Sequence, residues 1–284
     1  MSMGQTITPA LVKQLRDQTG VGMSKCKEAL EQSEGDIEGA ISFLRKAGMT
    51  SAVKKAGRAT QEGKVVVYEG DEVVALVEVN AETDFVVKNE KFQEFCQNLA
   101  AEVALRKPAT LEEFIKMPYS KDPELTIDQY RSLLIQTIGE NIQIRRIALF
   151  EKRATESIGI YSHLGGKIVS IVVLHGQGEE ELARNIAMHV AATGPEFLNP
   201  EEVPQEIVTK EQEIARGQIQ GKPEHIVEKI LEGKLNAFFD MCCLTRQKYV
   251  RDDALSVEEI VNKHGVSVGK DLRVIRFLRW VAGK

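Results

Sequence analysis

Hydrophobic residues in the first fifty positions recur at the spacing of short amphipathic helices. The first helix is predicted to begin at Thr8-Pro9, an N-cap followed by a proline, and to end at Gly20. Its apolar face consists of Leu11, Val12 and Leu15. The second and third helices carry apolar residues at Cys26, Ala29 and Leu30 and at Ile37, Ala40, Ile41 and Leu44, with Asp36 as a cap and Gly48 after the last turn. A three-helix unit of this size is marginally stable and is suited to presenting a surface.

The hydrophobic period changes to that of β-strands after residue 64. Residues 65–68 and 73–79 are rich in valine and flank Glu69-Gly70-Asp71, a pattern typical of a hairpin. A helix follows, with Asn89 as a possible cap and with an apolar stripe formed by Phe92, Phe95, Cys96, Leu99 and Val103. The basic, glycine-containing residues 54–64 are interpreted as a linker between the helices and this second part.

This strand-and-helix pattern occurs a second time. Residues 168–174 form an apolar run, Gly176 and Gly178 indicate a turn, and a helical stripe follows at Leu182, Ile186, Ala187, Val190 and Ala191. The two copies predict a duplicated α+β module, in which the second copy lacks the segment that joins strand to helix in the first. Residues 127–139 are helical in pattern, and residues 142–150 and 273–281 are strand-like.

Two charged helical stretches follow Pro200. They are separated by Gly221-Lys222-Pro223, so they predict a helical hairpin over about residues 200–240. The predicted fold class is α+β. Its parts are a three-helix domain (1–53), a linker (54–64), a first core subdomain (65–155) and a second core subdomain that contains the hairpin (156–284).

Composition narrows the function classes. The formal net charge of the 284 residues is −5, whereas nucleic-acid binders usually carry a basic face, so direct nucleic-acid binding is not expected. No apolar run reaches the ~18 residues of a membrane helix. The four cysteines, at 26, 96, 242 and 243, show no metal-binding spacing, which is typical of reduced thiols. We therefore expect a cytoplasmic protein without membrane contact.

Catalytic motifs are missing from the sequence. Residues 217–222 and 265–270 resemble a phosphate-binding loop but are one residue too short, and neither lysine precedes serine or threonine. There is no HExxH or GxSxG motif. Glu179-Glu180-Glu181 is interpreted as favourable charge at a helix start. We therefore expect no catalytic residue, cofactor or metal site, although an enzyme with an unrecognised site stays open.

One connection between a predicted strand and a predicted helix is unusually apolar. In Thr83-Asp84-Phe85-Val86 an aromatic residue and a valine follow an acid, where polar turn residues would suffice. One interpretation is a hydrophobic staple that tucks Phe85 under the helix. The alternative is an exposed anchor that inserts into a partner, with Asp84 making a charge-assisted hydrogen bond beside it.

This segment and an earlier one resemble the two motifs of the elongation factor Ts family. The resemblance lies in LRDQTGVGMSKCKEAL (15–30) and EVNAETDFVVKN (78–89), and IGEN (138–141), IAMHVA (186–191) and PEF (195–197) follow in family order. It implies a ubiquitin-associated-like helical domain, then two related α+β subdomains with a coiled-coil hairpin inserted in the second.

The resemblance also implies a function. Members of the family bind elongation factor Tu and release its GDP, in a 1:1 or 2:2 complex and without covalent chemistry of their own. Thr83, Asp84, Phe85 and Val86 would enter the partner's nucleotide domain and dislocate its magnesium. Secondary contacts are implied for Met23, Lys27, Ile138, Gly139 and His163. The sequence departs from the family at Met241 and Lys248, which leaves contacts near the hairpin's exit open.

Plainer interpretations accompany several of these residues. Met23 is equally explained as a plug in the helical core, Lys27 as a solvated helix face, and His163 as an ordinary turn residue after a strand. A rival function is RNA or ribosome binding through a basic patch made of Lys54, Lys55, Arg58 and Lys64. That patch lacks interleaved aromatic residues, which argues against it.

Overall fold

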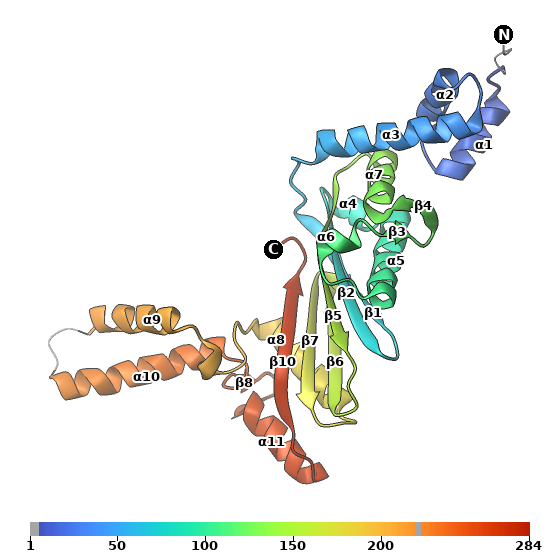
Figure 1. The fold of residues 1–284 in the computed structure, drawn as a ribbon. Helices are drawn as coiled ribbons and strands as arrows, with labels where there is room; N and C mark the ends of the chain where they lie inside the picture. The colour runs from blue at the N-terminus through green and yellow to red at the C-terminus, as the bar shows by residue number, and fades with distance from the viewer. Residues whose placement is uncertain (1–5, 220–222) are drawn as a thin grey trace. The chain divides into compact units, whose positions relative to one another are not determined.

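The computed structural model describes residues 6–219 and 223–284. Its contacts separate two compact units (Figure 1). The first contains the chain up to Glu151 together with Ala282–Lys284, and the second contains Lys152–Val281. The four-part division predicted from the sequence stays a prediction.

The first unit opens with three helices. They are α1 (Pro9–Thr19), α2 (Met23–Gln32) and α3 (Ile37–Lys55). The predicted caps are present: the Thr8 hydroxyl accepts a hydrogen bond from the Leu11 amide at 3.2 Å, and Gly20 is left-handed at φ 66°. The small core contains the predicted side chains, among them Leu15, Cys26, Leu30 and Leu44, and in addition Val21, which the pattern did not indicate.

Helix α3 is longer than predicted, because Gly48 does not end it. Ala52, one turn further on, is buried in the larger core of the unit, so the second half of the helix is stabilised by tertiary packing. A Cβ at Gly48 would lie 2.9 Å from Cδ2 of Leu133 in α7, which shows how closely the helices approach. The basic residues 54 and 55 are therefore helical, and only residues 56–61 connect α3 to the first strand.

A three-stranded antiparallel sheet forms the centre of the first unit. Its order is β1 (Glu62–Glu69), β2 (Val73–Ala81) and β5 (Ile142–Glu151). Alternate residues of β2 pack with α5 (Glu90–Arg106) and α7 (Ile127–Ile138) in one core. The remaining elements are α4 (Asp84–Val87), α6 (Leu111–Phe114), β3 (Pro118–Tyr119) and β4 (Asp122–Thr126).

The second unit repeats this order of elements. Its sheet runs β10 (Arg273–Val281), β7 (Ile168–His175) and β6 (Glu156–His163), again with the second strand in the centre. Helix α8 (Glu180–Thr193) corresponds to α5, the ribbon of β8 (Lys248–Tyr249) and β9 (Asp252–Ser256) to β3 and β4, and α11 (Val257–Val268) to α7. The predicted duplicated α+β fold is confirmed. Two 3₁₀ turns, η1 (Leu164–Gly166) and η2 (Pro200–Glu202), complete the unit.

The predicted helical hairpin is inserted between α8 and β8. Its helices are α9 (Gln205–Gly217) and α10 (Glu224–Cys242), which lie side by side and extend away from the sheet of their unit (Figure 1). Pro223 directly precedes α10. The other two residues of the predicted turn, Gly221 and Lys222, lie outside the described residues.

Gly159 in β6 lies directly against the backbone of α8. A Cβ there would lie 2.0 Å from the carbonyl carbon of Ala183 and from the amide nitrogen of Arg184, both backbone atoms of α8. Because a helix backbone cannot move aside like a flexible side chain, we expect Gly159→Ala to lower the free energy of unfolding by about 3 kcal/mol in urea titrations. Gly233→Ala, in open space on α10, is the control and should be neutral or stabilising. An unchanged midpoint for Gly159→Ala would contradict this packing.

Candidate functional site

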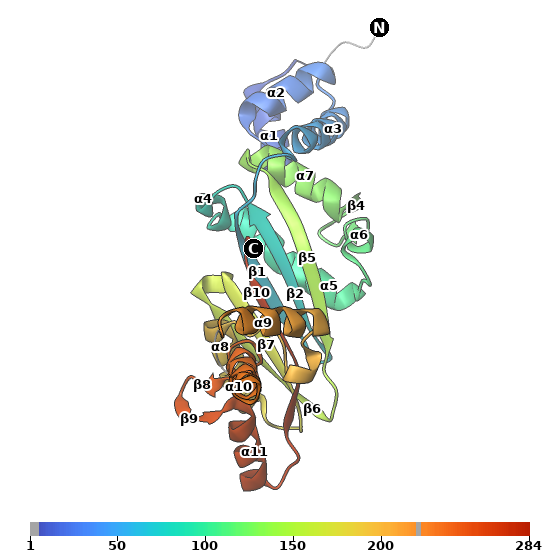
Figure 2. The same ribbon diagram turned by 90° about the vertical axis from the view of Figure 1, so that its left-hand side faces the viewer.

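The apolar connection found in the sequence forms the one-turn helix α4. It lies at the end of the central strand β2, at the edge of the first unit (Figure 2). In the second unit the corresponding connection is only a short turn from Gly176 to Glu179 between β7 and α8. The duplicated architecture therefore does not require α4, so its presence calls for another explanation.

Phe85 points away from the protein. It is 80% exposed, whereas its neighbour Val86 is 7% exposed and belongs to the main core. The staple interpretation of Phe85 is therefore wrong. Successive residues of an α-helix point about 100° apart, and in α4 it is Val86 that faces the core while Phe85 faces outward. Val86 takes the buried place and leaves the aromatic ring outside.

Asp84 places a negative charge beside the exposed ring. The Lys88 ammonium donates a hydrogen bond to Oδ2 of Asp84 at 2.7 Å, and this bond lowers the pKa of the Asp84 carboxyl below its ordinary value. The carboxylate is thus ionised at neutral pH while it remains about half exposed. An aromatic ring and a carboxylate presented together form a compact surface suited to a cationic and apolar pocket.

The start of α4 is attached to the connection between α7 and β5. Thr83 is the N-cap of α4, and its amide donates to Oε2 of Glu140 at 3.0 Å. Ile138 is the last residue of α7, and Gly139 ends that helix in the left-handed region at φ 95°. This contact joins the segment that begins at Thr83 to the residue that directly follows Ile138 and Gly139. Glu140 carries this contact and was not singled out from the sequence.

The helical residues Met23 and Lys27 are exposed on α2. Met23 is the first residue of the helix and is not part of the small core, so it does not act as a plug. Lys27 forms an exposed ion pair with Glu31 at 3.6 Å. Both side chains are available to a partner, while an ordinary solvated role for Lys27 is equally compatible with these contacts.

Two lysines attach the three helices to α7. The Lys25 ammonium donates to the Gln136 carbonyl at 3.4 Å, and the Lys55 ammonium donates to the Ile135 carbonyl at 3.5 Å. Both carbonyls lie in the last turn of α7, and the negative end of a helix dipole attracts cations. Burial, followed by the charge of Lys25, lowers the pKa of Lys55. Arg58 pairs with Glu82 at 3.5 Å. Two of the four groups in the proposed RNA-binding patch are therefore engaged within the protein, which weakens that alternative.

His163 lies in the second unit at the end of β6. It is exposed, its Nδ1 lies 3.3 Å from the hydroxyl oxygen of Tyr161, and the two rings stack at 6.0 Å between centroids. It is followed by Leu164, a non-glycine residue at φ 49°.

The two positions that depart from the family pattern differ in their surroundings. Met241 is exposed on α10, and the Lys248 ammonium donates to the Ala254 carbonyl at 3.1 Å.

His189, within the matching segment 186–191, has a structural role. Its Nδ1 accepts a hydrogen bond from the Val250 amide at 3.2 Å, so Nε2 carries the proton and donates to Oε1 of Gln247 at 3.0 Å. That oxygen also accepts from the Thr193 hydroxyl at 2.8 Å. The ring is fully buried, and burial lowers the pKa of His189 below its ordinary value of 6.5. The imidazole is a neutral link between α8 and the chain that follows α10.

This network predicts a pH-dependent stability. The unfolded chain takes up a proton on His189 near pH 6.5 and the folded chain only at lower pH, so the free energy of unfolding should fall as pH drops below 6.5. The slope contributed by one such histidine is at most about 1.4 kcal/mol per pH unit. Urea titrations at pH 7.5, 6.5 and 5.5 measure it. His189→Gln should flatten the profile, and an equal slope in both proteins would contradict the assignment.

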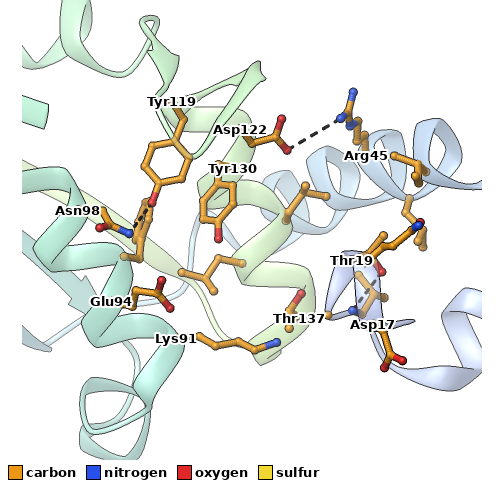
Figure 3. Close-up of a pocket in the computed structure, with 18 residues that line it drawn as sticks. Asp17, Thr19, Arg45, Lys91, Glu94, Asn98, Tyr119, Asp122, Tyr130 and Thr137 are labelled. Atoms are coloured by element: carbon orange, nitrogen blue, oxygen red, sulfur yellow. Dashed lines mark hydrogen bonds and ion pairs between the residues drawn. The ribbon is translucent and has the colours of Figure 1, made fainter. Parts of the chain in front are cut away.

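A cavity of about 440 Å³ lies between the first three helices and the α5–α7 face of the same unit (Figure 3). Two pairs of its polar side chains interact: the Asn98 amide donates to the Tyr119 hydroxyl at 3.0 Å, and Arg45 lies 3.9 Å from Asp122. Lys91, Glu94 and Thr137 also point into the space (Figure 3). No nucleophile is paired with a base among its lining residues, so the cavity does not have the arrangement of a catalytic site.

Other kinds of site were sought in residues 6–219 and 223–284. In these residues no cluster of three or more histidine, cysteine or acidic side chains has a geometry that could hold a metal ion. None of the helices they form is long and apolar enough to cross a membrane. All four cysteines are buried free thiols, and burial raises the pKa of each, which is typical of unreactive thiols.

Comparison with known proteins agrees with the motifs. The family model described as elongation factor TS matches residues 82–284. Elongation factor Ts of Protochlamydia amoebophila is 59% identical over 279 residues, which cover 98% of this chain and 99% of the relative. The elongation factors Ts of Chlamydia felis and Chlamydia pneumoniae are 42% and 43% identical over 273 residues, or 96% of this chain and 97% of each relative. The α4 segment, the repeated sheets and this similarity together place the chain in the elongation factor Ts family of translation elongation factors.

Proposed function

We propose that this protein binds GDP-bound elongation factor Tu in the cytoplasm and promotes release of the GDP by inserting Asp84 and Phe85 into the nucleotide domain. The observation that carries the proposal is the exposure of Phe85. Its side chain is 80% exposed on α4, while the neighbouring Val86 is buried and the N-cap residue of the helix, Thr83, is held by Glu140. Thr83 and Val86 fix the helix, and Asp84 and Phe85 make the contact. Insertion would displace the groups that hold the partner's magnesium ion.

The contact is large enough for this task. By thermodynamic linkage, a factor that weakens GDP binding must bind the GDP-bound partner less tightly than the nucleotide-free partner. The two affinities change by the same ratio. Each tenfold weakening requires about 1.4 kcal/mol of differential contact. Burial of a phenylalanine contributes about 1.5–3 kcal/mol and a hydrogen bond to a charged group about 1.5–3 kcal/mol. Together these two residues can account for a weakening of roughly a hundredfold or more.

Further contacts would enlarge the interface. Met23 and Lys27 on α2, Ile138 and Gly139 at the end of α7, and His163 at the end of β6 are proposed as secondary contacts. The complex is proposed to be 1:1 or 2:2, without direct contact to nucleic acid or membrane. The protein would act by binding alone, without a cofactor or covalent chemistry, and GTP binding would favour its release from the partner.

The test follows the release of fluorescent GDP from elongation factor Tu in the presence of excess unlabelled nucleotide. Addition of this protein should raise the release rate to a plateau as its concentration increases. If the protein acts through the magnesium site, chelation of magnesium should raise the basal rate and shrink the stimulation. No stimulation at any protein concentration would refute the proposed function, and stimulation that is unaffected by chelation would refute the role of magnesium.

A further inference from the structure

Each of the two units has an equivalent internal contact at the end of its last helix. Helices α7 and α11 each have twelve residues and each end at a left-handed glycine, Gly139 at φ 95° and Gly269 at φ 67°. The next residue is Glu140 in the first unit and Lys270 in the second. In both units the side chain of this residue returns to the connection that follows the central strand. The position after the glycine is therefore equivalent in the two copies.

In the first unit this position binds the residue that starts α4. The Thr83 amide donates to Oε2 of Glu140 at 3.0 Å, and the Thr83 hydroxyl donates to Oε1 at 2.8 Å. The hydroxyl oxygen of Thr83 also accepts from the Val86 amide at 3.4 Å, as an N-cap does. One carboxylate thus receives both donors of the residue that begins the helix.

A second carboxylate makes the reverse contact. Oε1 of Glu82 accepts from the Asn141 amide at 2.6 Å, and the Asn141 side chain donates to the Arg58 carbonyl at 3.0 Å. Two crossed hydrogen bonds therefore join residues 82 and 83 to residues 140 and 141, and in each of them a backbone amide donates to a carboxylate. Such bonds to charged groups are stronger than those between neutral groups.

In the second unit the equivalent residue also holds an N-cap residue, but it donates the hydrogen bonds instead of accepting them. The Lys270 ammonium donates to the Gln177 carbonyl at 2.7 Å and to Oε1 of Glu179 at 2.5 Å. Glu179 is the N-cap of α8, as Thr83 is of α4. Its other carboxylate oxygen lies 2.7 Å from Nε2 of His264, and the contact with Lys270 lowers the pKa of Glu179. The connection from Gly176 to Glu179 carries no aromatic residue, so this contact offers a comparison in which no ring is presented.

We propose that Glu140 is a positioning residue for nucleotide exchange: by holding Thr83 it fixes α4 so that Phe85 is presented in one orientation. This inference rests on the proposed function. A helix of four residues is not stable by itself, so its orientation depends on the groups that hold its ends. A contact segment that is already ordered loses less conformational entropy on binding, which raises affinity.

The experiment compares Glu140→Ala with Lys270→Ala, which breaks the equivalent contact in the second unit. Hydrogen–deuterium exchange of the free protein should show faster exchange of the amides of residues 83–88 only in Glu140→Ala, and of the amides near residues 177–180 only in Lys270→Ala. In the GDP-release assay Glu140→Ala should raise the concentration for half-maximal rate about tenfold, the change expected from one hydrogen bond to a charged group. Its plateau rate should change little, because the bound partner reorders α4.

Conservative variants test the hydrogen bonds themselves. Glu140→Gln should restore most of the affinity, because its amide oxygen can accept from the Thr83 amide and its NH₂ group can donate to the Thr83 hydroxyl. Glu140→Asp keeps the charge but shortens the side chain. It replaces Glu140→Ala in both measurements if Glu140→Ala does not fold. It should resemble Glu140→Ala.

The outcomes separate this inference from the proposed function. Unchanged amide exchange at residues 83–88 together with an unchanged half-maximal concentration in Glu140→Ala would overturn the positioning role. An equal loss in Lys270→Ala would also overturn it, because reduced stability would then explain both variants. In either case a defect in Phe85→Ala would leave the proposed function standing. If Phe85→Ala releases GDP like the wild type, the insertion of the ring is refuted and the positioning role of Glu140 fails with it, whereas exchange activity itself is refuted only if the wild type gives no stimulation.

Discussion

Phe85→Ala is expected to fold like the wild type and to lose most of the acceleration of GDP release from elongation factor Tu. The ring is 80% exposed, so its removal takes away almost no packing in the free protein. In the complex the same ring would be buried, which is worth about 1.5–3 kcal/mol. If that energy is used to open the nucleotide site, the plateau rate of release should fall about tenfold to a hundredfold.

The measurement is the rate of fluorescent GDP release at saturating concentrations of each protein. Phe85→Leu is an informative companion, since it keeps an apolar side chain but not the flat ring, and it should show an intermediate rate. Circular dichroism and urea titration should give the wild-type midpoint for both variants. A wild-type plateau rate in a folded Phe85→Ala would exclude the ring from the exchange step, whatever its effect on affinity.

Phe92→Ala, seven residues further along, should have the opposite pattern. Phe92 is fully buried on α5 in the core shared with β2 and α7. Truncation of such a ring leaves a cavity and lowers the free energy of unfolding by about 3–5 kcal/mol. Urea titration followed by circular dichroism measures the loss, and a change below about 1 kcal/mol would contradict the assignment of Phe92 to the core.

The pair of variants also separates stability from function. Molecules of Phe92→Ala that remain folded should accelerate GDP release at a rate close to that of the wild type, because α4 is still present. Phe85→Ala should be fully folded and slow. If both variants showed the same combined loss, the effect of Phe85 would have to be attributed to the fold instead of to a contact with the partner.

The candidate site was predictable in part. The unusual composition of residues 82–87 separates it from an ordinary turn, and the absence of a matching segment in the second copy supports the same conclusion. What the pattern could not decide was whether Phe85 or Val86 faces the core, because adjacent apolar residues are equally good candidates for burial. The contact from Glu140 to Thr83 was also beyond reach, since 57 positions separate the two residues and no local spacing relates them.

Features that depend on near neighbours in the chain could be predicted without a structure. The caps at Thr8, Asp36 and Asn89, the hairpin around Gly70, the repeated strands and the hairpin helices were all predicted, because caps, turns and periodic stripes act within a few residues. Only the tertiary structure decided that α3 continues past Gly48, that Phe85 is left outside, and that Glu140 and Lys270 hold equivalent helix starts. These outcomes depend on contacts between segments far apart in the chain, whose energies override local preference.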